Sequence, residues 1–96
     1  MSTDAELKLP DAETLQNAVR LAVVEDRPVM LDYWVDSIKQ EALIGVRENG
    51  EKLLVKNKDE YTSCISKIFK VKTDYIVMTE NSIYIVDTAI PTRRIS

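Results

Sequence analysis

Residues 42–56 read ALIGVRENGEKLLVK, so that two apolar runs flank the polar sequence Glu48-Asn49-Gly50-Glu51. An Asn-Gly pair between such runs is the strongest short signal of a β-hairpin, because both central residues of a type I′ turn need a positive φ. The sequence therefore predicts antiparallel strands over residues 42–47 and 52–56, joined by a tight turn at Asn49 and Gly50.

The segment before the hairpin begins with a helical pattern. From Asp11 onward, apolar residues recur at three- and four-residue spacing, which predicts an amphipathic helix over residues 11–25. We expect Asp11 to accept hydrogen bonds from free amides of the first turn. Pro28 ends the helix, because the residue before a proline is pushed out of the α region.

The apolar period then changes to two over residues 29–36. Leu31 and Tyr33 fall on one face and Trp34 on the other, which predicts a half-buried strand. Farther along the chain, residues 61–72 alternate imperfectly, and we expect a strand with a bulge there. Short turns at 72–74 and 80–82 lead into further strands at 75–79 and 83–86.

These elements predict an α+β fold, in which an N-terminal amphipathic helix precedes a five- to six-stranded antiparallel meander. No long helical crossover is present, as parallel neighbours would require. We expect the sheet to close into a small Sm-like barrel, because closure removes exposed strand edges. The residues expected in the core are apolar and face inward in this arrangement: Leu15, Val19, Ala22, Val23, Leu31, Tyr33, Ile44, Val46, Leu53, Val55, Phe69, Val77, Ile83 and Ile85.

The expected domain spans residues 11–87, between a flexible N-terminus at 1–10 and an extended C-terminal arm at 88–96. Pro91 disfavours continuation of the last strand in the same ladder. The arm carries Arg93 and Arg94 between two isoleucines. It is therefore expected to reach a partner or a second copy of the chain, with a frayed end as the alternative.

Residues 18–33, AVRLAVVEDRPVMLDY, resemble the opening of WYL-type modules, which begin with a helix, a charged turn and a strand that ends near a tyrosine. Those modules fold as a small Sm-like barrel, so the resemblance implies a helix followed by such a barrel. The chain lacks the Trp-Tyr-Leu run that names the family, and no functional residue carries over from it.

Composition excludes several classes of chemistry. The 96 residues include no histidine, one cysteine and two glycines, so Cys/His zinc sites, Ser-His or Cys-His nucleophile pairs and phosphate-cradling glycine loops are not expected. Cys64 has no partner for an internal disulfide and is expected to be a small buried filler. We therefore expect no enzyme activity, no cofactor and no metal.

Charge and hydropathy bear on partners and location. The net charge of −3 argues against nonspecific nucleic-acid binding by the whole surface, and the longest apolar runs are too short to span a bilayer. Asp4 and Glu6 stand where a signal peptide has a basic segment. The expectation is a chain without membrane contact, located inside the cell, in the cytoplasm or within an assembly.

Six residues are candidates for an interaction surface: Trp34, Lys67, Lys70, Lys72, Arg93 and Arg94. Trp34 either anchors a partner or packs in the core, and core packing is favoured because large aromatics are highly buried on average. The lysines of residues 67–72, with Lys52, Lys56 and Lys58, would form a basic patch if they lay on neighbouring strands. Interleaved acids favour an ordinary solvated face instead.

The leading interpretation is a noncatalytic protein-interaction or structural module, an accessory component of a larger assembly that binds a protein partner or itself. The alternative is a small-barrel regulatory module that binds a ligand or nucleic acid.

Overall fold

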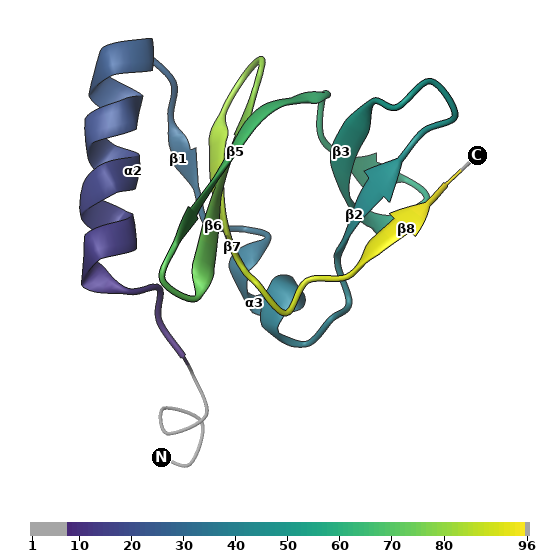
Figure 1. The fold of residues 1–96 in the computed structure, drawn as a ribbon, viewed down its shortest axis with the longest axis horizontal. Helices are drawn as coiled ribbons and strands as arrows, with labels where there is room; N and C mark the ends of the chain where they lie inside the picture. The colour runs from purple at the N-terminus through teal and green to yellow at the C-terminus, as the bar shows by residue number, and fades with distance from the viewer. Residues whose placement is uncertain (1–7, 96) are drawn as a thin grey trace.

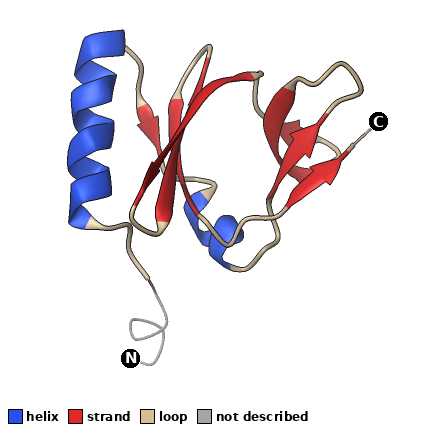
Figure 2. Ribbon diagram, viewed as in Figure 1, coloured by secondary structure: helices blue, strands red, loops and turns tan. Residues whose placement is uncertain are grey.

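The structure is a computed structural model that describes residues 8–95. One long helix, α2 (Ala12–Glu25), lies against one face of a first sheet (Figure 1). The opposite face of that sheet is turned toward a second sheet. Figure 2 shows the same layers, with a short helix, α3 (Trp34–Ile38), between the sheets at one end.

The first sheet has the strand order β1-β7-β6-β5, and the second has the order β4-β3-β2-β8. The strands of the first sheet are β1 (Val29–Met30), β5 (Ile65–Val71), β6 (Asp74–Thr79) and β7 (Ile83–Asp87). Those of the second are β2 (Leu43–Val46), β3 (Lys52–Asn57), β4 (Glu60–Tyr61) and β8 (Thr92–Arg94).

The predicted α+β class is confirmed, but the order of strands differs from a simple meander. Neighbours along the chain pair in antiparallel fashion, from β5 to β7 and from β2 to β4, whereas β1 pairs with β7 and β8 pairs with β2 in parallel. Over residues 8–95 neither sheet closes into a barrel. The Sm-like barrel is thus not confirmed.

Helix α2 begins and ends as predicted. The carboxylate of Asp11 accepts a hydrogen bond from the Glu13 amide at 2.9 Å, and a buried carboxylate, Asp74, accepts from the Asp11 amide at 2.9 Å and from the Thr14 hydroxyl at 2.8 Å. Asp26 closes the C-terminus in a left-handed conformation, with φ 56°. Both ends of the helix therefore have partners for backbone groups that helical bonds leave free.

The predicted strand over residues 29–36 is wrong beyond Met30. After β1 the chain turns, with the Trp34 amide donating to the Leu31 carbonyl at 3.1 Å, and enters α3. This turn sends two consecutive aromatic residues into different layers: Tyr33 packs between the sheets, and Trp34 packs beneath α2. Burial of both rings outweighs the alternating pattern that predicted a continuous strand.

The predicted hairpin is confirmed, although its turn is of another kind. Within this loop only Gly50 has a positive φ, at 92°, and Asn49 does not. The Gly50 amide donates to the Arg47 carbonyl at 2.9 Å, and the Arg47 amide donates to the Glu51 carbonyl at 2.8 Å. This is the three-residue loop in which a turn is followed by one left-handed residue.

We expect Gly50→Val to lower the free energy of unfolding by about 1 kcal/mol, because a side chain is strained in the left-handed region. Glu48→Val, in the same loop but without a positive φ, is the control and should change stability by less than about 0.5 kcal/mol. Urea titration measures both. Equal stability of the two variants would contradict this description of the loop.

The predicted bulge is confirmed, because the register of β5 against β6 shifts between Ile65 and Lys67. The predicted C-terminal arm is wrong: β8 pairs with β2, and Ile90 lies in the core. A switch to the second sheet, where the Pro91 carbonyl accepts from the Ile44 amide at 2.8 Å, satisfies backbone groups that the ladder of β7 would not. Of the predicted flexible N-terminus, residues 1–10, the first seven lie outside the described residues.

Two hydrophobic clusters lie on opposite faces of the first sheet. The cluster between the sheets contains Tyr33, Ala42, Ile44, Leu54, Val77, Val86 and Ile90. The cluster beneath α2 contains Ala18, Trp34, Ile76, Met78, Ile83 and Ile85. Strands β6 and β7 are therefore apolar on both faces because each face contacts a different layer.

Several members of the predicted core are not buried. The prediction is confirmed for Tyr33, Ile44, Leu53, Val77, Ile83 and Ile85. Ala22, Val46 and Val55 are half-buried. The core prediction is wrong for five residues that are exposed: Leu15, Val19, Val23, Leu31 and Phe69. Helix α2 instead turns its small residues Thr14 and Ala18 to the sheet, and this rotation leaves larger apolar side chains in solvent.

Desolvation raises the pKa of the Tyr33 phenol from 10.0 to about 12, with smaller contributions from Tyr84 and nearby acids. The folded state thus holds this proton more tightly than the unfolded chain, so stability present below about pH 10 is lost as the pH rises toward 12. The pKa of the Lys8 ammonium is also raised, chiefly by its hydrogen bond to Asp87, and this contribution is likewise lost above the ordinary lysine pKa.

We therefore expect the melting temperature to fall steeply between about pH 10 and pH 12. Tyr33→Phe removes one titrating phenol and should flatten this fall, while smaller slopes remain from Lys8 and from Tyr84, whose pKa burial also raises. Thermal melts across this range check the expectation. An identical slope in parent and variant would show that Tyr33 is not the group responsible.

Candidate functional site

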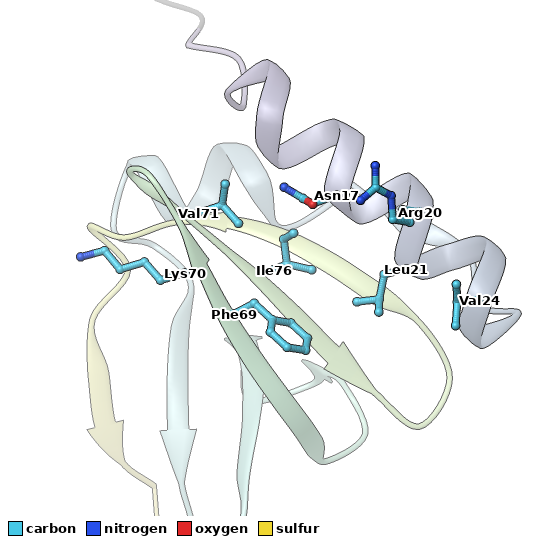
Figure 3. A pocket seen from close by; sticks show the side chains of 8 residues that line it. All are labelled: Asn17, Arg20, Leu21, Val24, Phe69, Lys70, Val71 and Ile76. Atoms are coloured by element: carbon cyan, nitrogen blue, oxygen red, sulfur yellow. The ribbon is translucent and has the colours of Figure 1, made fainter.

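An open groove lies between α2 and strand β5. The helix packs on β1, β6 and β7, and β5 extends beyond it as the last strand of the sheet. The groove has a volume of about 430 Å³, and Figure 3 shows its side chains. They come from the helix and from two strands: Asn17, Arg20, Leu21, Val24, Phe69, Lys70, Val71 and Ile76.

The groove is mainly apolar. Ile76 is buried at its floor, and Leu21 and Val71 are half-buried beside it. Phe69 and Val24 are 40% and 71% exposed, and in Figure 3 the Phe69 ring lies across from Leu21. Phe69 was predicted in the core; it is exposed because the helix does not cover β5.

Basic side chains surround this apolar surface. Along β5, Lys67 and Phe69 share the face that α2 covers, because their partners Met78 and Ile76 lie there. Ile68 and Lys70 project from the opposite face, and Figure 3 shows Lys70 pointing away from the helix. Arg20 contributes a guanidinium from α2. No acidic residue occurs between Ile65 and Val71.

Strand β5 forms the edge of the first sheet. It pairs with β6 on one side, and no strand among residues 8–95 pairs with the other. An edge strand presents a row of unpaired N–H and C=O groups, which template the addition of another chain. The groove and this strand edge adjoin, since Phe69 belongs to both.

The remaining sequence candidates lie elsewhere. Trp34 is 4% exposed and its indole donates to the Lys8 carbonyl at 2.7 Å, so it is a core residue and no exposed anchor. Lys72, in the turn after β5, has its ammonium 3.6 Å from the Glu13 carboxylate. Arg93 and Arg94 are exposed on β8 in the second sheet.

The two lysine-rich segments lie on different sheets. Lys52 and Lys56 lie on β3 of the second sheet, whereas Lys67 and Lys70 lie on β5 of the first. The Lys56 ammonium lies 4.8 Å from the centre of the Tyr33 ring. The strands β3 and β5 belong to different sheets but touch, and Lys52 and Lys67 line one hollow there together with Glu51. An acid is thus interleaved with the lysines at that place.

A second hollow lies on the outer face of the second sheet, with a volume of about 490 Å³. Leu53, Val55, Tyr61 and Ile95 contribute apolar surface, with Arg47 and Lys58 among the lining residues. Gly45 allows this arrangement, because a Cβ there would lie only 2.8 Å from the Ile95 side chain. An aromatic ring and two cations therefore share one exposed face.

The helix side of the α2–β5 groove was missed by the sequence reasoning. A signal for it exists in the adjacent pair Val23 and Val24, since consecutive helix positions are 100° apart and Val24 therefore widens the apolar stripe that the three- and four-residue spacing predicts. Both valines are exposed, and Val24 turns toward β5.

Chemical groups suited to catalysis do not gather at either hollow. Among the described residues, no group of three or more His, Cys, Asp or Glu side chains is placed to hold a metal ion. Partial burial raises the pKa of the Cys64 thiol, with Glu51 adding to the shift, so the reactive thiolate is disfavoured. In the part of the chain that the structure describes, no helix has the length and apolar character needed to cross a membrane.

Comparison with known proteins gives no relative: no protein-family model, curated protein or solved structure matches this chain.

Proposed function

We propose that this chain is a noncatalytic protein-interaction module, working within a larger assembly, that binds another polypeptide in the α2–β5 groove. One observation carries the proposal: an exposed aromatic and aliphatic surface adjoins a strand edge with which no strand of residues 8–95 pairs. Aromatic residues are enriched in protein interfaces, and a few such side chains provide most of the binding energy. Phe69 is the anchor in this proposal.

Scattered exposed apolar residues are normal on any protein and need no partner. The groove differs because Val24, Leu21 and Phe69 come from two elements and line one continuous hollow. A partner side chain that enters it contacts apolar atoms on both sides, and burial of such area favours binding.

A crosslinking experiment tests the proposal with a matched pair of sites. A photo-reactive amino acid replaces Phe69 in one variant and Val35 in another, since both residues are 40% exposed and Val35 lies on α3, away from the groove. The protein crosslinked in the native source from position 69 alone is identified and purified. Its affinity is then measured for the parent, Phe69→Ser and Val35→Ser.

We expect Phe69→Ser to weaken binding by roughly tenfold or more, because an aromatic anchor at the centre of an interface is lost. Val35→Ser should leave the affinity unchanged. Equal affinities for both variants would exclude the groove as the binding site.

A second candidate function is nucleic-acid binding on the outer face of the second sheet. Tyr61 offers a ring for base stacking beside the cations of Arg47 and Lys58. Fluorescence anisotropy with short single-stranded oligonucleotides tests it: binding should fall steeply with salt and with Tyr61→Ala.

A further inference from the structure

We propose that the occupant of the α2–β5 groove is an extended acidic segment of another protein, which pairs with the outer edge of β5 as a fifth strand of the first sheet. This inference rests on the proposed function and adds the conformation and charge of the bound segment.

The backbone of β5 supports an extended occupant. The strand has seven residues, Ile65–Val71, and pairs on one side only among the described strands. A chain added to such an edge gains main-chain hydrogen bonds, and its alternate side chains enter neighbouring pockets. Strands in a sheet lie about 4.8 Å apart, so the side chain of a residue beside Phe69, on the face that α2 covers, would pack against the Phe69 ring at the open side of the groove.

The charge around the edge selects an acidic occupant. Lys67 and Lys70 lie on β5, Arg20 faces the groove from α2, and the strand has no acid of its own. Lysines on an edge strand also protect it from pairing with copies of itself. A second copy of β5 would add two more lysines to the same strand pair, which like-charge repulsion disfavours. An acidic strand replaces this repulsion with attraction, so the same lysines exclude one partner and favour the other.

The order of residues along β5 defines the pattern that a partner strand needs. Lys67 and Lys70 favour acids opposite them, and Ile68 and Phe69 between them favour apolar residues. The complementary pattern is acid–apolar–apolar–acid. It reads the same in both directions, so it holds whether the added strand runs parallel or antiparallel to β5.

A peptide library tests this inference on the full chain. Peptides randomised over about ten positions, long enough to pair with the whole of β5, are displayed and selected for binding. We expect the acid–apolar–apolar–acid pattern to be enriched. The best synthetic peptide is then titrated against the parent, the double variant Lys67→Glu/Lys70→Glu and Phe69→Ser.

The matched control for charge is Lys39→Glu/Arg93→Glu, which reverses two exposed basic residues away from β5. The variant at positions 67 and 70 should bind roughly tenfold more weakly than this control, because two attractive pairs become repulsive.

Strand pairing itself is tested by N-methylation of the peptide backbone. Successive amides of an added strand point alternately toward β5 and away from it. Methylation of one alternating set should therefore abolish binding, and methylation of the other set should leave it nearly unchanged. If both sets have the same effect, the added-strand geometry is overturned.

The outcomes separate this inference from the proposed function. Selected peptides that need Phe69 but carry no acidic residues contradict the acidic segment, and peptides that tolerate methylation at either set contradict strand pairing. Both results still agree with the proposed function, a groove that binds a polypeptide. Peptides unaffected by Phe69→Ser, or no selected peptide at all, overturn both. Dimerisation of the chain that Phe69→Ser abolishes would identify a second copy as the occupant and likewise overturn the acidic segment.

Discussion

Replacing Trp34 with alanine is expected to lower the free energy of unfolding by about 3–5 kcal/mol, the usual cost of truncating a buried tryptophan. The ring lies beneath α2, in the cluster that includes Ala18, Ile83 and Ile85. Its indole N–H also donates to the Lys8 carbonyl at 2.7 Å. The variant therefore leaves a cavity, and it removes a bond that holds the segment before α2 against the core. Urea or thermal unfolding measures the loss.

Two variants separate these contributions. Trp34→Phe keeps most of the ring but loses the indole donor, so it should fall between parent and alanine variant. Val35→Ala, at the exposed next position, should cost less than about 1 kcal/mol. If Trp34→Ala melts like the parent and instead loses a partner, Trp34 is an exposed anchor and its position in the core is incorrect.

The elements that were predicted correctly depend on local chemistry. Asp11 caps α2, Gly50 supplies the left-handed residue of the hairpin loop, and the broken alternation near Ser66 marks the bulge in β5. Each signal lies within a few residues of the structure that it produces. Local sequence was therefore sufficient for most helix and strand positions.

The errors arise where distant segments decide the structure. Residues 29–36 alternate as a strand does, yet Tyr33 and Trp34 pack in two different clusters, each built from segments that are distant along the chain. The C-terminal residues look like an arm until β2 offers them a parallel partner. No local pattern contains this information, because the partners are more than 40 residues apart along the chain.

The candidate site was predicted only in part for the same reason. Lys67 and Lys70, selected as candidates for an interaction surface, are exposed on β5, but a role for them depends on which strand edge is open. Phe69 was predicted as a core residue because its strand is amphipathic. Only the placement of α2 over β1, β6 and β7 leaves that ring exposed, and the sequence does not specify the lateral position of a helix on a sheet.

Leu54→Ala is expected to cost about 2–5 kcal/mol, because the side chain is fully buried in the cluster that joins the two sheets. It packs there with Tyr33 and Val77, so its truncation weakens contact between two layers at once. Leu31→Ala is the matched control: the alternating pattern placed Leu31 in the core, but it is 51% exposed and should cost less than about 1 kcal/mol. The same chemical change is thus made in both variants, and urea unfolding compares them directly. A larger loss at Leu31 than at Leu54 would mean that residues 29–36 form the predicted strand and that the turn into α3 is incorrect.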